Sequence, residues 1–67
     1  MTIIYFELDP DVSINVLQRI YRDMEQMPEI VDYQQRIGFE LDLSVEDLNF
    51  FIDEYGCYIS TFCNMNQ

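Results

Sequence analysis

Carboxylates are the most numerous groups in this sequence that could do chemistry. Thirteen Asp and Glu residues stand against three arginines, with no lysine and no histidine. Two carboxylates can suffice for glycosidase chemistry, but that reaction also needs a substrate cleft, which 67 residues can hardly enclose. Other acid–base and nucleophilic sites usually need a His, a Lys or a Cys–His pair. We therefore expect no enzymatic activity.

Metal and phosphate binding leave few candidates. Residues 9–15, DPDVSIN, match the first ligand positions of a calcium loop. The match ends there, because Ile14 replaces the required glycine and Ile20 replaces the bidentate glutamate. No glycine-rich phosphate loop is present, since Gly38 and Gly56 are the only glycines and both fit helix ends. We expect no metal and no cofactor.

The two cysteines and the first residues indicate the compartment. Cys57 and Cys63, six apart on one expected strand, would lie roughly 20 Å from each other, too far for a disulfide. We expect reduced, buried and unreactive thiols in a cytoplasmic protein. The start, MTIIYFELDPD, lacks the basic and apolar regions of a signal peptide. No run approaches the roughly 18 apolar residues of a membrane span.

The elements that must position the carboxylates follow from hydrophobic spacing and from capping residues. We expect, in order, a strand at 2–8, a helix at 10–26, a short second helix at 28–37, a strand at 39–43, a helix at 45–55, a strand at 57–63 and a polar tail at 63–67. Asp9 is expected to cap the first helix, Pro28 to open the second and Gly38 to close it. Residues 44–47, SVED, resemble a capping box for the third.

These elements predict one small α+β domain over residues 1–67, in the order β-α-α-β-α-β. We expect about three strands in one sheet, with the helices packed on one face. Connections through helices favour some parallel strand pairing. The apolar fraction of 49% is enough for a globular core, and a mostly helical fold is the alternative.

The acids of the helix at 45–55 form two rows. Glu46 and Asp53 are seven residues apart, as are Asp47 and Glu54. Seven residues make nearly two turns, so the two acids of each row lie roughly 10 Å apart along the axis. We expect the opposite face to point inward, with Val45, Leu48, Phe51, Ile52 and Tyr55. Phe50 lies between the rows, and Glu40 and Asp42 on the preceding strand could extend the surface.

The three arginines are expected to be neutralised locally. The pairs three or four residues apart are Arg19 with Asp23, Arg22 with Glu25, and Asp32 with Arg36. From Ile37 onwards there are six acids and no base. The helix at 45–55 is therefore expected to carry an uncompensated anionic surface.

An acidic field repels nucleic acid and anionic membranes and attracts basic protein surfaces. Our hypothesis is a non-enzymatic binding protein that occupies a basic, nucleic-acid-binding surface of a partner, as a DNA mimic does. We expect it to contact the partner through Glu46, Asp47, Asp53, Glu54, Glu40, Asp42 and Phe50. In size, charge and lack of catalytic groups the chain resembles phage-encoded inhibitors such as anti-restriction and anti-CRISPR proteins, a likeness of composition that assigns no site residue.

The alternative is an acidic adaptor, subunit, or antitoxin- or immunity-like protein. Such a protein would dock through an apolar interface, and its charge would serve solubility. A chain of 67 residues is near the lower limit for folding unaided. A homodimer that shares apolar surface is one way to stabilise so small a core.

Overall fold

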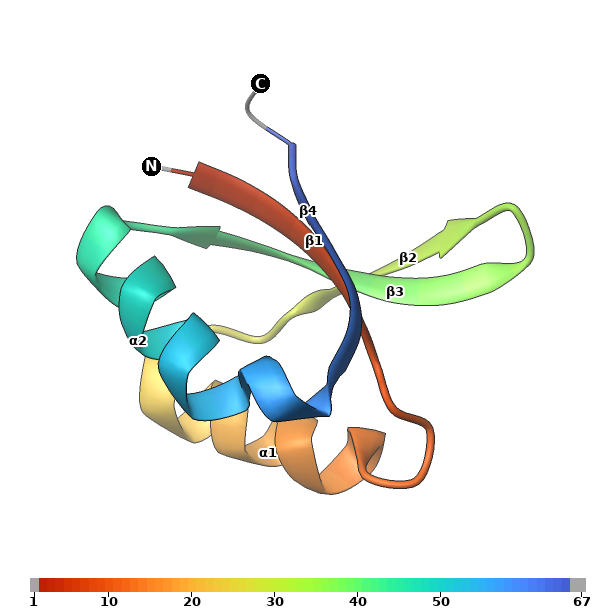
Figure 1. Ribbon diagram of the computed structural model, residues 1–67, viewed down its shortest axis with the longest axis horizontal. Helices are drawn as coiled ribbons and strands as arrows, with labels where there is room; N and C mark the ends of the chain where they lie inside the picture. The colour runs from red at the N-terminus through yellow and green to blue at the C-terminus, as the bar shows by residue number, and fades with distance from the viewer. Residues whose placement is uncertain (1, 66–67) are drawn as a thin grey trace.

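The protein has four strands in one sheet, rather than three. The computed structural model describes residues 2–65 (Figure 1). Its elements are β1 (Thr2–Leu8), α1 (Ser13–Met24), β2 (Glu29–Tyr33), β3 (Arg36–Leu43), α2 (Val45–Tyr55), a 3-10 helix (Gly56–Tyr58) and β4 (Ile59–Asn64). Neither helix is long and apolar enough to cross a membrane within these residues.

All neighbouring strands pair antiparallel, in the order β2-β3-β1-β4. The α+β class is confirmed, and the expected parallel pairing is wrong. Each helix does connect two strands that run the same way, but a third strand lies between them. This is the split β-α-β arrangement, with the element order β-α-β-β-α-β.

The expected second helix at 28–37 is wrong, because these residues form β2, a turn and the start of β3. Tyr33 pairs with Arg36, which leaves a loop of two residues. Those residues, Gln34 and Gln35, have φ angles of 51° and 66°. A two-residue hairpin loop with two positive φ angles is a type I′ turn, usually marked by Asn-Gly. Gln-Gln is not a typical type I′ pair, so the sequence does not predict this hairpin.

Gly38 lies within β3 and does not end a helix. The ring of Tyr5 covers it from the neighbouring strand, so that a Cβ at Gly38 would stand 2.3 Å from Tyr5 Cε2. Only a residue without a side chain fits beneath the ring. The requirement for glycine here comes from close approach, since the φ angle of Gly38 is not positive.

Both helices lie on one face of the sheet, as expected (Figure 1). Alternate residues of β1 and β3 point toward them, as the period of a strand requires. The Phe6 ring centroid lies 5.6 Å from that of Phe39, with the two planes tilted by 35°, and 5.0 Å from that of Phe51, in an edge-on arrangement. The buried core consists of Ile4, Phe6, Leu8, Val16, Ile20, Phe39, Leu41, Leu43, Phe51 and Tyr55. The other face of the sheet has no helix over it.

Helix α1 begins three residues later than expected, and Asp9 does not cap it. Asp9 Oδ1 accepts a hydrogen bond of 3.1 Å from the Asp11 amide, two residues on. The Asp9 carboxylate is thus engaged in a local turn that precedes the helix and does not cap it. Val12 is the N-cap residue, and no side chain there accepts a hydrogen bond from the helix. At the other end Glu25 has a φ of 53°, which ends the helix at Met24.

The last segment differs from the expected strand at 57–63. A 3-10 helix takes Gly56–Tyr58, and β4 continues to Asn64, so part of the expected tail is strand. Residues 66 and 67 of that tail lie outside the described residues. Cys57 and Cys63 are free and exposed, and the expected burial of both is wrong. The reason is that Cys57 lies outside the sheet and Cys63 lies on its uncovered face.

Candidate protein-binding surface

Helix α2 begins where the SVED pattern predicts. Ser44 has an extended backbone, with φ −68° and ψ 166°, and its Oγ accepts a hydrogen bond of 3.2 Å from the Asp47 amide. Glu46 and Asp47 lie in the first turn, where the helix dipole favours negative charge. The local sequence therefore fixes both the start of the helix and the position of its first two acids.

The face that α2 turns inward is narrower than expected. Phe51 and Tyr55 are buried and Leu48 is partly buried, as predicted. Val45 and Ile52 were also expected inward, but they are 68% and 45% exposed. At about 100° per residue, a face centred on Phe51 and Tyr55 leaves these two on a flank. The face opposite the core then carries Glu46, Asp53 and Phe50, and Phe50 is 45% exposed.

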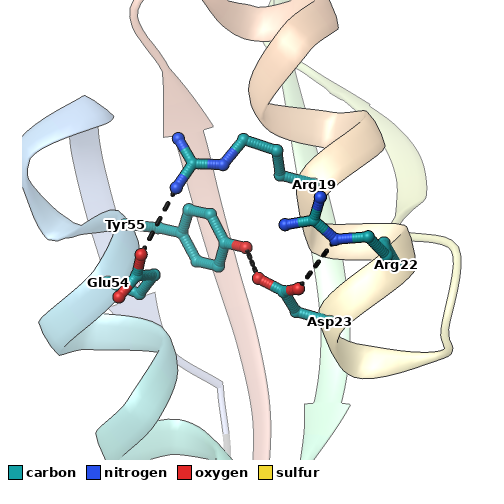
Figure 2. Close-up of polar contacts among 5 residues, drawn as sticks. All are labelled: Arg19, Arg22, Asp23, Glu54 and Tyr55. Atoms are coloured by element: carbon teal, nitrogen blue, oxygen red, sulfur yellow. Dashed lines mark hydrogen bonds and ion pairs between the residues drawn. The ribbon is translucent and has the colours of Figure 1, made fainter.

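Glu54 does not belong to an uncompensated row. Its Oε1 lies 3.3 Å from an Arg19 guanidinium nitrogen on α1 (Figure 2). Arg19 also lies over the Tyr55 ring, 5.4 Å from its centroid. The expected pair of Arg19 with Asp23 is wrong, because the Asp23 carboxylate is bound by other groups. The Arg19–Glu54 pair is largely exposed and contributes little to stability.

Asp23 joins the two helices beneath that pair. Its carboxylate accepts one hydrogen bond from the Tyr55 hydroxyl and one of 3.1 Å from Arg22 Nε (Figure 2). Burial, and then the bond to Asp23, raise the pKa of Tyr55 to about 12. The Tyr55 hydrogen bond, followed by that of Arg22, lowers the pKa of Asp23. Arg22 therefore pairs with Asp23 and not with Glu25 as predicted.

Glu40 and Asp42 belong to the sheet and lie on a different surface from the acids of α2. The neighbours of each along β3 are buried beneath the helices, so both acids point to the uncovered face of the sheet. Glu29 on β2 pairs directly with Glu40, which adds a third acid on that face. The side-chain amide of Gln26 bonds both backbone groups of Asp42, at 3.1 and 3.2 Å. The structure therefore divides the expected contact residues between two surfaces.

The uncovered face also holds a groove that the sequence analysis missed. It has a volume of about 340 Å³ and is lined mainly by Tyr5, Val31, Tyr33, Arg36, Cys63 and Met65. Reading residues 28–37 as a hairpin would have revealed it, since Val31 and Tyr33 then share a face with Tyr5. Tyr33 falls within the segment expected to be helical, 28–37, and is exposed on β2 instead.

A polar network crosses the floor of this groove. Glu7 accepts hydrogen bonds of 2.6 Å from the Tyr5 hydroxyl and 2.7 Å from Arg36, and Arg36 also bonds Thr61 at 3.2 Å. The Tyr5 bond, then Arg36, lower the pKa of Glu7 against the opposing effect of its burial. Arg36 pairs with Glu7 and not with Asp32 as predicted, because β3 lies beside β1.

Both surfaces carry carboxylates, and these differ in whether they are paired with an arginine. Within residues 2–65 no three Asp, Glu or Cys side chains stand close enough to hold a metal ion. In this range Glu46, Asp47 and Asp53 make no ion pair, while Glu7, Asp23 and Glu54 each bind one arginine. In comparisons with known proteins, no family model, no curated protein and no solved structure matches the chain.

Proposed function

We propose that this chain is a non-enzymatic acidic protein that occupies a basic, nucleic-acid-binding surface of a partner protein, in the manner of a DNA-mimic inhibitor. One observation carries the proposal. Each of the three arginines is bound by another acid, one of which is Glu54 of α2, whereas Glu46, Asp47 and Asp53 on the same helix make no ion pair within residues 2–65. These three carboxylates are exposed, so a basic surface can reach them without breaking an internal contact.

The arrangement on α2 suits a surface that binds phosphates. Glu46 and Asp53 stand about 10 Å apart along the helix axis. Duplex DNA carries one charge per roughly 1.7 Å, so this helix can replace part of a phosphate array and not its full density. Phe50, exposed between the acids, supplies the aromatic anchor typical of interface hot spots. The carboxylates would meet Lys and Arg groups that otherwise hold phosphates, and so exclude nucleic acid.

The test is the combined reversal Glu46→Lys, Asp47→Lys and Asp53→Lys. Glu54 stays unchanged, because its pair with Arg19 belongs to the contact between the helices. The protein is used to capture nucleic-acid-binding proteins from a host lysate, and the captured proteins are identified and purified. We expect the triple variant to lose binding, the wild-type complex to weaken steeply with salt, and added duplex DNA to compete.

A matched control changes charge equally at another place. Asp11→Lys, Glu29→Lys and Asp32→Lys replace three exposed acids outside α2 and also move the net charge from −10 by +6 to −4. The control should retain most of the binding. Equal loss in both variants would show a response to net charge rather than to the α2 surface. Full binding by the α2 variant would refute the proposal.

An apolar docking function is the second candidate, favoured by the exposure of Val45 and Ile52 on α2. An adaptor, or an antitoxin- or immunity-like protein, would bind its partner through such side chains. Its complex would respond strongly to Phe50→Ala or Ile52→Ala and only weakly to salt or to the triple reversal. The salt titration of the wild-type complex therefore separates the two functions.

A further inference from the structure

The two edges of the sheet are protected very differently. Edge strands expose unpaired backbone groups, and natural proteins usually guard them with charges. Strand β2, at one edge, has Glu29 and Asp32 among its five residues. Strand β4, at the other edge, is ISTFCN and has no charged residue. No charged side chain occurs anywhere after Glu54, although the chain carries sixteen before that point or at it.

The backbone of β4 presents hydrogen-bonding groups at this unguarded edge. The Met65 amide donates a hydrogen bond of 2.9 Å to the Ile3 carbonyl. Residues of an antiparallel strand alternate between facing their partner strand and facing away from it. Because Met65 faces β1, the backbone N–H and C=O groups of Cys63 and Thr61, two and four residues earlier, also face β1. Phe62 therefore directs its N–H and C=O to the open edge.

The flank of α2 beside β4 is also uncharged. A groove of about 330 Å³ separates the two elements and is lined by Ile52, Gly56, Ile59, Ser60, Thr61 and Phe62. Phe62 is 42% exposed there. Val45 is seven residues before Ile52 and so continues the same flank toward the start of the helix. The edge strand and the helix flank together form one uncharged strip, which we call the β4 strip and define by Val45, Ile52, Ile59 and Phe62.

Charge decides which occupant fits this strip. A basic partner is drawn to the acids of the other surfaces and gains no electrostatic attraction at the β4 strip. A second copy, with its own net charge of −10, is repelled by those acids and can approach most closely where both surfaces are neutral. The strip also offers the apolar area that a 67-residue core lacks.

We propose that β4 pairs antiparallel with β4 of a second copy, with the two-fold axis at Phe62. Each Phe62 would then donate to and accept from its counterpart, as in a hydrogen-bonded pair of an antiparallel ladder. The two sheets become one continuous sheet with all helices on the same side. Ile52 of each copy faces the axis beside the two Phe62 rings. This pairing does not depend on the partner proposed above.

The test uses Phe62→Glu, which places two like charges at the axis. Ile30→Glu is the matched control, because Ile30 is 71% exposed on the opposite edge strand. Sedimentation equilibrium should show a concentration-dependent dimer for the wild type and for Ile30→Glu. Phe62→Glu should weaken the dimer at least about tenfold, with circular dichroism confirming that the variant is folded.

Two further measurements on the wild type use no variant. Hydrogen exchange of the Phe62 amide should slow as protein concentration rises, because the dimer protects it. Raising salt should strengthen the dimer by screening the repulsion between copies, the opposite of its effect on a basic partner's complex. A monomer at all concentrations and salts, a Phe62 amide indifferent to concentration, or an undiminished Phe62→Glu dimer would each overturn the pairing. The wild type could also prove monomeric while Phe62→Glu abolishes binding to the partner protein. That result would show that the β4 edge binds a strand of the partner, and it would likewise overturn the β4–β4 pairing.

Discussion

The turn between β2 and β3 gives the sharpest test of the fold. A helix and a hairpin at this segment predict stability changes of opposite sign for the same double substitution. Gln34 and Gln35 both hold positive φ angles, 51° and 66°, in a loop of two residues. The double change Gln34→Asn and Gln35→Gly supplies the pair that a type I′ turn prefers. In a hairpin this change relieves backbone strain, whereas in a helix it introduces two poor helix formers.

The magnitudes follow from the backbone. A left-handed conformation costs an ordinary L-residue roughly 1–2 kcal/mol, and glycine has no such cost. Glycine also gains entropy in the unfolded chain, which offsets roughly 0.4–1 kcal/mol of this. Asparagine tolerates the conformation at Gln34 slightly better than glutamine does. We therefore expect the double variant to be more stable by about 1 kcal/mol. A helix at 28–37 would instead lose about 1.5 kcal/mol.

The assay is urea unfolding followed by far-UV circular dichroism, with the thermal midpoint as a second readout. For a domain of this size about 1 kcal/mol corresponds to a rise of roughly 4–8 °C. Gln18→Gly is the control, since Gln18 is exposed within α1 and the same change should there destabilise by about 1 kcal/mol. Destabilisation of both variants would refute the hairpin turn and restore the helix.

Two further substitutions test contacts within the core and across the sheet. Tyr55→Phe removes the hydrogen bond to Asp23 and should cost about 1.5 kcal/mol near neutral pH, whereas Tyr21→Phe at an exposed position should cost little. The pKa of Tyr55 rises from 10.0 to about 12 on folding, so its stabilisation is full below pH 10 and is lost as pH rises toward 12. The pKa of Asp23 is lowered on folding, so the stabilisation from that carboxylate is lost as the pH falls through its folded-state pKa. The free energy of unfolding, measured against pH, should therefore show that Tyr55→Phe destabilises less at low and at high pH than near neutral pH. A destabilisation independent of pH would contradict the hydrogen bond between Tyr55 and Asp23. Gly38→Ala should cost about 1–2 kcal/mol, because the Tyr5 ring must move and lose its bond to Glu7. In a Tyr5→Ala background the same change should cost almost nothing, and an undiminished cost there would rule out the ring as the cause.

The elements that the sequence predicts correctly are those fixed by local interactions. Strand β1 has the expected bounds, because TIIYFEL is rich in β-branched and aromatic residues. Helix α2 starts at the expected residue, because Ser44 caps it within four residues of sequence. In both cases a single short segment contains the physical cause of its own structure.

The failures come from causes that a short segment does not contain. The segment at 28–37 has apolar residues that fit helical spacing, and only pairing with β3 decides for a strand. The arginine pairs show the same limit. Arg36 binds Glu7, 29 residues away, and Arg19 binds Glu54, 35 residues away. Helical spacing predicts only pairs that are three or four residues apart in the sequence, so it cannot predict either of these ion pairs. The groove on the uncovered face was missed for the same reason, since four strands build it.

The faces of α2 link the two proposals. One flank is tied to α1 through Glu54, the outer face carries Glu46 and Asp53, and the other flank belongs to the β4 strip. Pairing at β4 would leave both outer faces exposed on the same side of the joined sheet, so one partner surface could meet acids from both copies. A basic partner would also neutralise the repulsion that opposes pairing. Because binding equilibria are reciprocal, such a partner must then strengthen the dimer by the same factor by which the dimer strengthens its binding.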